Sequence, residues 1–94
     1  MHSMQKKCTI IVSGAVQGIG FRYYTQECAR ELGLAGFVRN ERDGAVRIEA
    51  QGDEASIREF IAWCENGPVY AQVDAVKVTW GDAQRQYQDF TIQR

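Results

Sequence analysis

The 94-residue chain has one histidine, one proline, three cysteines and no apolar run long enough to span a bilayer. The single histidine, His2, lies in a polar terminal segment, so no catalytic arrangement of serine, histidine and aspartate can be drawn. The formal net charge of −1 gives no general attraction to nucleic acid or to an anionic membrane. We therefore expect neither as a partner, and any anion-binding site must be local.

The cysteines, at Cys8, Cys28 and Cys64, are widely spaced and form no C-x-x-C pair. The acidic residues also lack the spacing of metal ligands, so we expect no metal and no cofactor. A free cysteine behaves as a small hydrophobe, and each of the three falls on a predicted core face. We therefore expect buried, unreactive thiols.

The N-terminal residues Met1 to Lys7 contain no apolar signal segment, which predicts a cytoplasmic protein. Residues 1–94 are expected to form one domain, with residues 1–6 flexible. The second methionine, Met4, leaves open whether residues 1–3 are native. A chain of this size is plausible as a monomer.

Hydrophobic periodicity predicts the element order β-α-β-β-α-β, and Phe90 and Ile92 suggest a short fifth strand after the polar loop over residues 81–88. Alternation predicts strands over residues 7–13, 36–40, 45–51 and 73–80, the last with a bulge near residues 74–75. Helical spacing predicts helices over residues 21–32 and from Asp53, a candidate cap, to Asn66. Because both helices must cover one face of one sheet, the order predicts an α+β, ferredoxin-like sandwich with an antiparallel sheet.

Three patterns within these elements assign residues to the core. In the third strand, Val46, Ile48 and Ala50 are expected to point inward, with Arg47, Glu49 and Gln51 outward. The expected core stripe of the first helix is Phe21, Tyr24, Cys28 and Leu32, and that of the second is Ile57, Phe60, Ile61 and Cys64.

The first strand and the first helix are joined by a glycine-rich stretch, residues 14–22, with the sequence G-A-V-Q-G-I-G-F-R. Glycines let backbone N–H groups turn inward, and a helix start adds unpaired donors and partial positive charge. Arg22 adds a permanent cation that can hold a phosphate with two donors. A phosphate cradle here would use the backbone of Val16, Gln17, Gly18, Ile19, Gly20 and Phe21. A turn of this kind can also be a simple connection, so the stretch alone leaves both interpretations open.

The predicted topology brings a second residue to this loop. The first and second strands run the same way with one strand between them, so Arg22 and Asn40 share one edge of the sheet, with backbones roughly 10 Å apart. Arg22 binds charge but cannot exchange protons, and Asn40 can position a water. Such a site has no general acid, which suits an acyl phosphate, because its carboxylate leaving group (conjugate-acid pKa roughly 4) departs without protonation.

Two motifs resemble the signatures of the acylphosphatase family. Residues 14–22 are similar to G-x-V-Q-G-V-x-F-R, with Ile19 in place of valine, and residues 36–46 are similar to its second signature, G-[aromatic]-[small]-[basic]-N-x-x-x-G-x-V. The resemblance covers nearly the whole chain. It implies an enzyme that hydrolyses acyl phosphates to carboxylate and inorganic phosphate without a metal. Arg22 and Asn40 would be its catalytic residues, binding the phosphoryl group and orienting the attacking water.

Several alternatives remain at this stage. Gln17 can be a polar turn residue or contact the substrate, and Arg39 and Arg42 can attract anionic substrates or lie solvated. The pocket could also hold phosphate, an acyl phosphate or carbamoyl phosphate without turnover. RNA-recognition domains share the strand order, but the exposed faces of the first and third strands here lack stacking aromatics.

Overall fold

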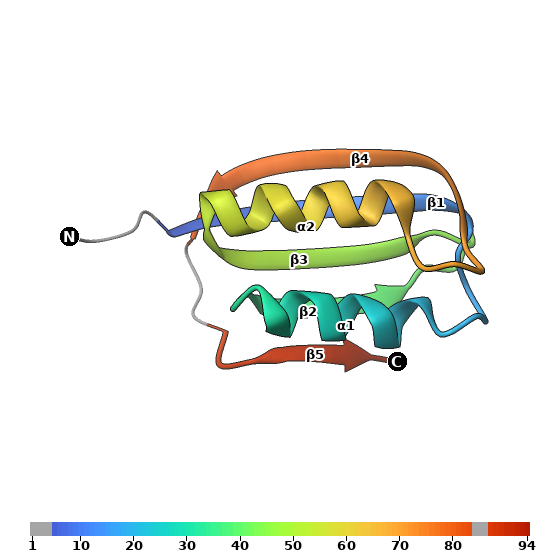
Figure 1. Ribbon diagram of the computed structural model, residues 1–94, viewed down its shortest axis with the longest axis horizontal. Coiled ribbons are helices and arrows are strands. Elements are labelled where there is room, and N and C mark those ends of the chain that lie inside the picture. Colours follow the sequence, from blue (N-terminus) through green and yellow to red (C-terminus); the bar gives the residue numbers. More distant parts are fainter. Residues whose placement is uncertain (1–4, 84–86) are drawn as a thin grey trace.

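The computed structural model describes residues 5–83 and 87–94, which form five strands and two helices in the predicted order (Figure 1). The elements are β1 (Gln5–Ala15), α1 (Phe21–Glu31), β2 (Ala35–Asn40), β3 (Val46–Asp53), α2 (Glu54–Asn66), β4 (Gln72–Asp82) and β5 (Phe90–Gln93). The fifth strand that the sequence suggested is therefore present.

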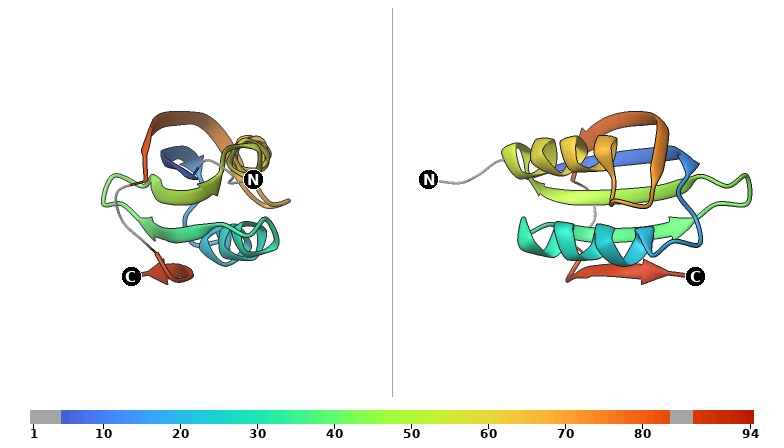
Figure 2. Two further views of the ribbon diagram at one scale, coloured as in Figure 1. Left: turned by 90° about the vertical axis from the view of Figure 1, so that its left-hand side faces the viewer. Right: turned by 45° about the vertical axis from the view of Figure 1, so that its right-hand side comes forward.

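The strands form one sheet in the order β4-β1-β3-β2-β5. Strands β1 and β2 are both antiparallel to β3, so they run the same way with one strand between them, as predicted. The four strands β1 to β4 pair antiparallel, as expected, whereas the short fifth strand β5 pairs with β2 in parallel and makes the sheet mixed. Both helices lie on one side of the sheet (Figure 2), with α1 over β2 and β5 and α2 over β4, β1 and β3.

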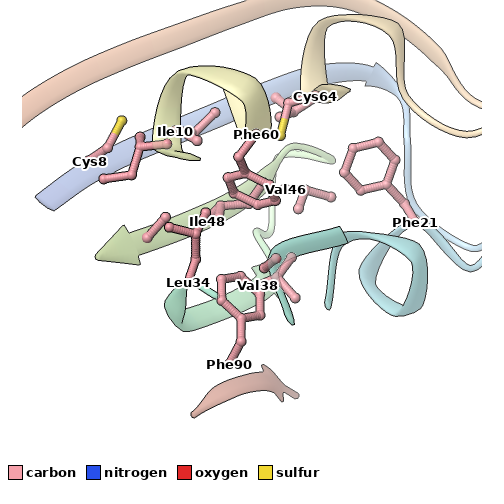
Figure 3. Close-up of a cluster of buried hydrophobic side chains, with 14 of the residues drawn as sticks. Cys8, Ile10, Phe21, Leu34, Val38, Val46, Ile48, Phe60, Cys64 and Phe90 are labelled. Carbon is pink, nitrogen blue, oxygen red and sulfur yellow. The ribbon is translucent and has the colours of Figure 1, made fainter. Parts of the chain in front are cut away.

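The core fills the space between the helices and the sheet (Figure 3). The inward residues predicted for β3, namely Val46, Ile48 and Ala50, are fully or almost fully buried. From α2, Phe60 is fully buried against Phe90 of β5, with ring centroids 5.9 Å apart. This contact joins α2 to the edge strand of the sheet. Each fully buried side chain of this kind stabilises the fold by about 1.5–3 kcal/mol.

The buried stripe of α1 differs from the predicted one. Phe21, Thr25 and Ala29 are buried, whereas Tyr24 is 45% exposed. Burial of Thr25 is tolerated because its hydroxyl donates to the Phe21 carbonyl oxygen at 2.7 Å, which removes the cost of an unpaired polar group. The small Ala29 lets the helix approach the sheet. The assignment of Tyr24 to the core is therefore wrong.

The ends of the strands also differ from the prediction. Gln5 and Lys6 pair with β3, so β1 begins two residues early and this part of the N-terminal segment is ordered in the sheet, while residues 1–4 lie outside the described chain. Gln51, expected to face outward, is buried. The predicted bulge is confirmed, because the β1–β4 register shifts between Ser13 and Gly14 and leaves Asp74 unmatched.

The second helix begins and ends where the sequence predicts. Asp53 occupies the capping position, although its side chain makes no capping hydrogen bond, and the helix stops at Asn66 before Gly67. The predicted polar loop over residues 81–88 begins later, since β4 extends to Asp82, and part of that loop lies outside the described residues. Neither helix of the described chain has the length and apolar character needed to cross a bilayer.

Candidate active site

Three segments meet at one end of the sheet: the loop between β1 and α1, the carboxyl end of β2 and the carboxyl end of β5 (Figure 1). They enclose a cavity of about 200 Å³, roughly the volume of six or seven liquid waters. Its lining includes six residues that the sequence singled out: Val16, Gly18, Gly20, Phe21, Arg22 and Asn40. The topology thus brings Arg22 and Asn40 to one cavity.

Two glycines of the loop adopt backbone conformations that other residues rarely take. Gly18 and Gly20 have φ angles of 79° and 81°, in the left-handed region where a side chain is strained. Gly20 also occupies the position before α1, and no side chain caps this helix. Within the described chain, the amides of residues 18–22 donate to no carbonyl, so they are available to an anion at the positive end of α1.

Gln17 attaches this loop to the β2–β3 hairpin. Its Nε2 donates to the carbonyl oxygens of Glu41 and Ala45, both at 2.8 Å. These two carbonyls close the hairpin that directly follows Asn40, because the Glu41 amide also donates to the Ala45 carbonyl. The Gln17 side chain therefore contacts the hairpin and does not line the cavity; Ile19 instead packs against the core.

Arg22 is oriented by the last strand. Its guanidinium donates to the backbone carbonyl of Gln93 at 3.0 Å. In the ranges 5–83 and 87–94, Arg22 forms no ion pair with an acidic side chain. The remaining guanidinium donors and the full positive charge are therefore available in the cavity.

Asn40 lies at the end of β2 on the face that the helices cover. It pairs with Val46, which places it on the same face as Val38 and Ile48. Its Oδ1 is buried and has no hydrogen-bond partner among the described residues. A buried, unpaired carboxamide oxygen costs about 1–3 kcal/mol, so a hydrogen-bond donor that reached it would stabilise the site.

Sequence reasoning missed three residues that line the cavity: Tyr23, Ile92 and Arg94. Tyr23 directly follows Arg22 on α1 and could have been found from that position. Ile92 and Arg94 belong to the end of the chain, which reaches the cavity because β5 lies parallel to β2. The sequence offered no signal for that pairing, since four residues can join a sheet in either direction.

The other candidate charges lie elsewhere. Arg39 forms an ion pair with Glu41 at 3.2 Å and lies over the ring of Phe37, 5.5 Å from its centroid. Both Phe37 and Arg39 belong to the face of β2 opposite Val38, so Arg39 does not line the cavity. Within residues 5–83 and 87–94, no three His, Cys, Asp or Glu side chains gather where a metal ion could bind.

The three thiols also lie away from the cavity. Burial raises the pKa of Cys8 to about 11 and raises that of Cys64 as well. Cys28 is only partly buried, contrary to expectation, but burial together with the negative charges of Glu31 and Glu59 raises its pKa to about 11. All three stay protonated at neutral pH and are poor nucleophiles.

The likeness to known proteins extends over the whole chain. A curated acylphosphatase from Salinibacter ruber is 40% identical over 90 residues, covering 96% of this chain and 95% of that protein. The crystal structure of acylphosphatase from Bacillus subtilis superposes with a TM-score of 0.92 at 37% identity, covering 95% of this chain and 99% of that one. Full-length HypF in a phosphate- and nucleotide-bound form gives a TM-score of 0.88 at 27% identity, covering all of this chain but 12% of that protein. Residues 8–92 match the family described as Acylphosphatase, and the chain belongs to that family.

Proposed function

We propose that this chain hydrolyses the carboxyl–phosphate bond of small acyl phosphates in the cavity beside Arg22 and Asn40, without a metal or cofactor. One observation carries the proposal: an arginine with no acidic partner in the described chain, unpaired loop amides and Asn40, whose buried carboxamide oxygen has no partner among the described residues, meet at one cavity. The first two suit a phosphoryl group, and the third suits a water next to it.

The phosphoryl group would bind to the loop. Amides of residues 18–22 would donate to its oxygens, and Arg22 would add charge-assisted hydrogen bonds from its free donors. Phosphoryl transfer passes through a loose transition state with charge on these oxygens, so catalysis rests on positioning and charge stabilisation. The loop amides and the guanidinium supply both.

Asn40 would position the water. A rotation of its carboxamide would turn the unpartnered oxygen from its buried position towards a water in the cavity. The amide is a poor base, so it holds the water in line with the phosphorus without taking its proton. The energetic cost of the unpaired oxygen in the resting protein would then be removed when the water is in place.

The reaction balances without a protein acid or base. The water oxygen forms a bond to phosphorus while the P–O bond to the acyl group breaks, and the electron pair of that bond leaves on the carboxylate. The water proton passes to an oxygen of the transferred phosphoryl group, giving inorganic phosphate. Since the carboxylate is a weak base with a conjugate-acid pKa of roughly 4, it leaves unprotonated.

Hydrolysis of benzoyl phosphate in the presence of a chelator tests this function. We expect turnover by the native chain, a loss of about 10³-fold in kcat/KM for Arg22→Ala, and a loss of about 100-fold, mainly in kcat, for Asn40→Ala. Arg58→Ala and Asn66→Ala are matched controls at exposed positions on α2. No rate above buffer for the native chain would refute the proposal, and dependence on added metal would refute its metal-free form.

A binding module without turnover is the second candidate. It is favoured by the likeness to a short part of full-length HypF, whose structure is described as phosphate- and nucleotide-bound. Binding of inorganic phosphate without hydrolysis of benzoyl phosphate or carbamoyl phosphate would support it over the enzyme.

The remaining proposals concern the domain organisation, cellular compartment and oligomeric state of the chain. We propose that it is a single-domain, cytoplasmic monomer, since three unpaired thiols suit a reducing compartment. Light scattering after size exclusion would test the monomer, and a mass near twice 10.6 kDa would contradict it.

A further inference from the structure

A second and larger hollow lies beside the phosphate cavity. It has a volume of about 500 Å³ and lies between α1 and the segment that follows α2. Its apolar lining includes Tyr24, Trp63, Val69 and Tyr70. Val69 is 91% exposed and Tyr70 is 82% exposed, so two large apolar side chains of this groove face solvent. Exposed apolar side chains gathered around a hollow indicate a ligand surface more often than scattered ones do.

Two pairs of aromatic rings separate the groove from the phosphate cavity. Tyr23 lines the cavity and Tyr24 lines the groove, and their rings meet edge to face with centroids 5.4 Å apart. Phe21 of the cavity and Trp63 of the groove have centroids 5.9 Å apart. The ring of Tyr24 also borders Gly20, where an added methyl group would lie 3.5 Å from Cε2. A ligand that extends from the loop by a few atoms therefore reaches the groove across these rings.

We infer that this groove binds the acyl group of the substrate and selects uncharged aromatic or bulky aliphatic acyl phosphates. The inference rests on the proposed function, because it assigns the part of the substrate that the small cavity does not hold. With the phosphoryl group at the loop, the carbonyl carbon and its substituent must leave the cavity. The tyrosine pair gives that substituent an apolar path into a hollow large enough for a phenyl ring.

The charge at the groove narrows the class of acyl group. Glu27 and Glu31, one turn apart on α1, both line it, and none of the lysines or arginines in the described parts of the chain does. A carboxylate or phosphate on the acyl group would be repelled there, although solvent screens the effect. Acyl phosphates whose acyl group carries a second carboxylate, such as succinyl phosphate, should therefore be poorer substrates than uncharged ones of the same length, such as butyryl phosphate.

The test compares acyl groups in matched variants. Values of kcat/KM for benzoyl phosphate and acetyl phosphate are measured for the native chain, Tyr24→Ala, Tyr70→Ala and the control Trp80→Ala, which removes an exposed aromatic of β4 that lines neither hollow. We expect the benzoyl-to-acetyl ratio to fall three- to tenfold in both tyrosine variants, through KM, and to stay unchanged in the control. Because this ratio is internal to each variant, a general loss of activity does not affect it.

Binding of acylphosphonates, which cannot be hydrolysed, gives a second measurement. The ratio of the Kd values of benzoylphosphonate and acetylphosphonate should change in the same variants by the same factor. Absence of turnover in the native chain would refute the proposed function, while the phosphonate ratio would still decide on the groove. An unchanged ratio in both tyrosine variants, or an equal change in Trp80→Ala, would overturn the inference.

A separate measurement tests the effect of Glu27 and Glu31 on the choice of acyl group. The double variant Glu27→Gln, Glu31→Gln should raise the rate on succinyl phosphate relative to butyryl phosphate two- to fivefold at low ionic strength. An unchanged relative rate would show that the acyl group leaves the cavity in another direction, past Ile92, and would overturn the inference.

Discussion

Replacement of Gln17 with alanine tests whether the proposed phosphate-binding loop, residues 16–21, depends on its attachment to the β2–β3 hairpin. The change removes two hydrogen bonds, from Nε2 to the carbonyls of Glu41 and Ala45 at 2.8 Å each. Neither carbonyl is left unpaired, because Gly44 donates to the first at 3.2 Å and the Glu41 amide to the second at 2.8 Å. The loss is therefore two net hydrogen bonds without a desolvation penalty, about 1–2 kcal/mol of unfolding free energy. For a chain of this size that lowers Tm by roughly 5–10 °C.

The effect on catalysis should exceed the effect on binding. Asn40 directly precedes the hairpin that Gln17 contacts, so these two bonds hold the proposed phosphate-binding loop relative to the residue proposed to place the water. A misplacement of about 1 Å between reacting groups can cost on the order of 100-fold. We expect kcat on benzoyl phosphate to fall 10- to 100-fold and the Kd for inorganic phosphate, measured by titration calorimetry, to rise less than tenfold.

Two further variants distinguish loss of the Gln17–hairpin hydrogen bonds from other causes of a lower kcat. Gln17→Glu keeps the shape but cannot donate, and it sets a carboxylate against two carbonyls, so it should destabilise more than Gln17→Ala. Asn66→Ala removes another bond from a side-chain amide to a backbone carbonyl, that of Ala62 at 3.3 Å, and because it lies away from the cavity it should leave kcat within about threefold. The reasoning is refuted if Gln17→Ala changes neither Tm nor kcat. Loss of phosphate binding with Tm unchanged would make Gln17 a direct ligand instead.

Three other outcomes follow from the structure. Phe60→Ala removes a fully buried ring and should lower the unfolding free energy by about 3–5 kcal/mol in urea denaturation, and a loss under 1 kcal/mol would contradict the described core. The pKa of Asp89 lies below its ordinary value because the Phe90 amide and Arg30 hydrogen-bond its ionised form, so its contribution to stability is present above pH 4 and is lost as pH falls through the lowered pKa. Asp89→Asn should therefore flatten the fall in Tm below pH 4, and an unchanged slope would contradict this. Since the thiol pKa of Cys8 is raised to about 11, iodoacetamide at pH 7.5 should label it only after unfolding, and rapid labelling of the folded chain would contradict its burial.

The sequence predicted correctly the parts of the fold in which apolar residues recur at a regular spacing. In β3 the alternation of Val46, Ile48 and Ala50 is strict, and each residue is buried as predicted. The order of elements then fixed the relation between β1 and β2, and with it the meeting of Arg22 and Asn40 at one cavity. The relative direction of β1 and β2 could be predicted because a short chain with this element order has few ways to cover one face of a sheet with both helices.

The error in α1 arose because a local hydrogen bond decides burial there. In α1, hydrophobicity alone favoured Tyr24 over Thr25 for the core. The Thr25 hydroxyl, however, is satisfied by the Phe21 carbonyl, so the smaller residue packs inside and the tyrosine ring remains half exposed beside Gly20. Periodicity does not carry information about such bonds, because it counts apolar side chains and not the partners available to polar ones.

Strand β5 explains why the candidate site extends beyond the two sequence motifs. Its parallel pairing with β2 brings the Gln93 carbonyl to the Arg22 guanidinium and Arg94 to the cavity. The strand is held to α1 by two further contacts, from Gln26 to the Phe90 carbonyl and from Arg30 to Asp89 at 2.9 Å. Helix α1 is thus attached at its start and middle to this strand of four residues and at its end to Asp89, which precedes the strand, and its first turn carries the proposed phosphate donors. The orientation of the guanidinium therefore depends on the docking of this short strand as well as on the glycine-rich loop, which no motif confined to the loop could have indicated.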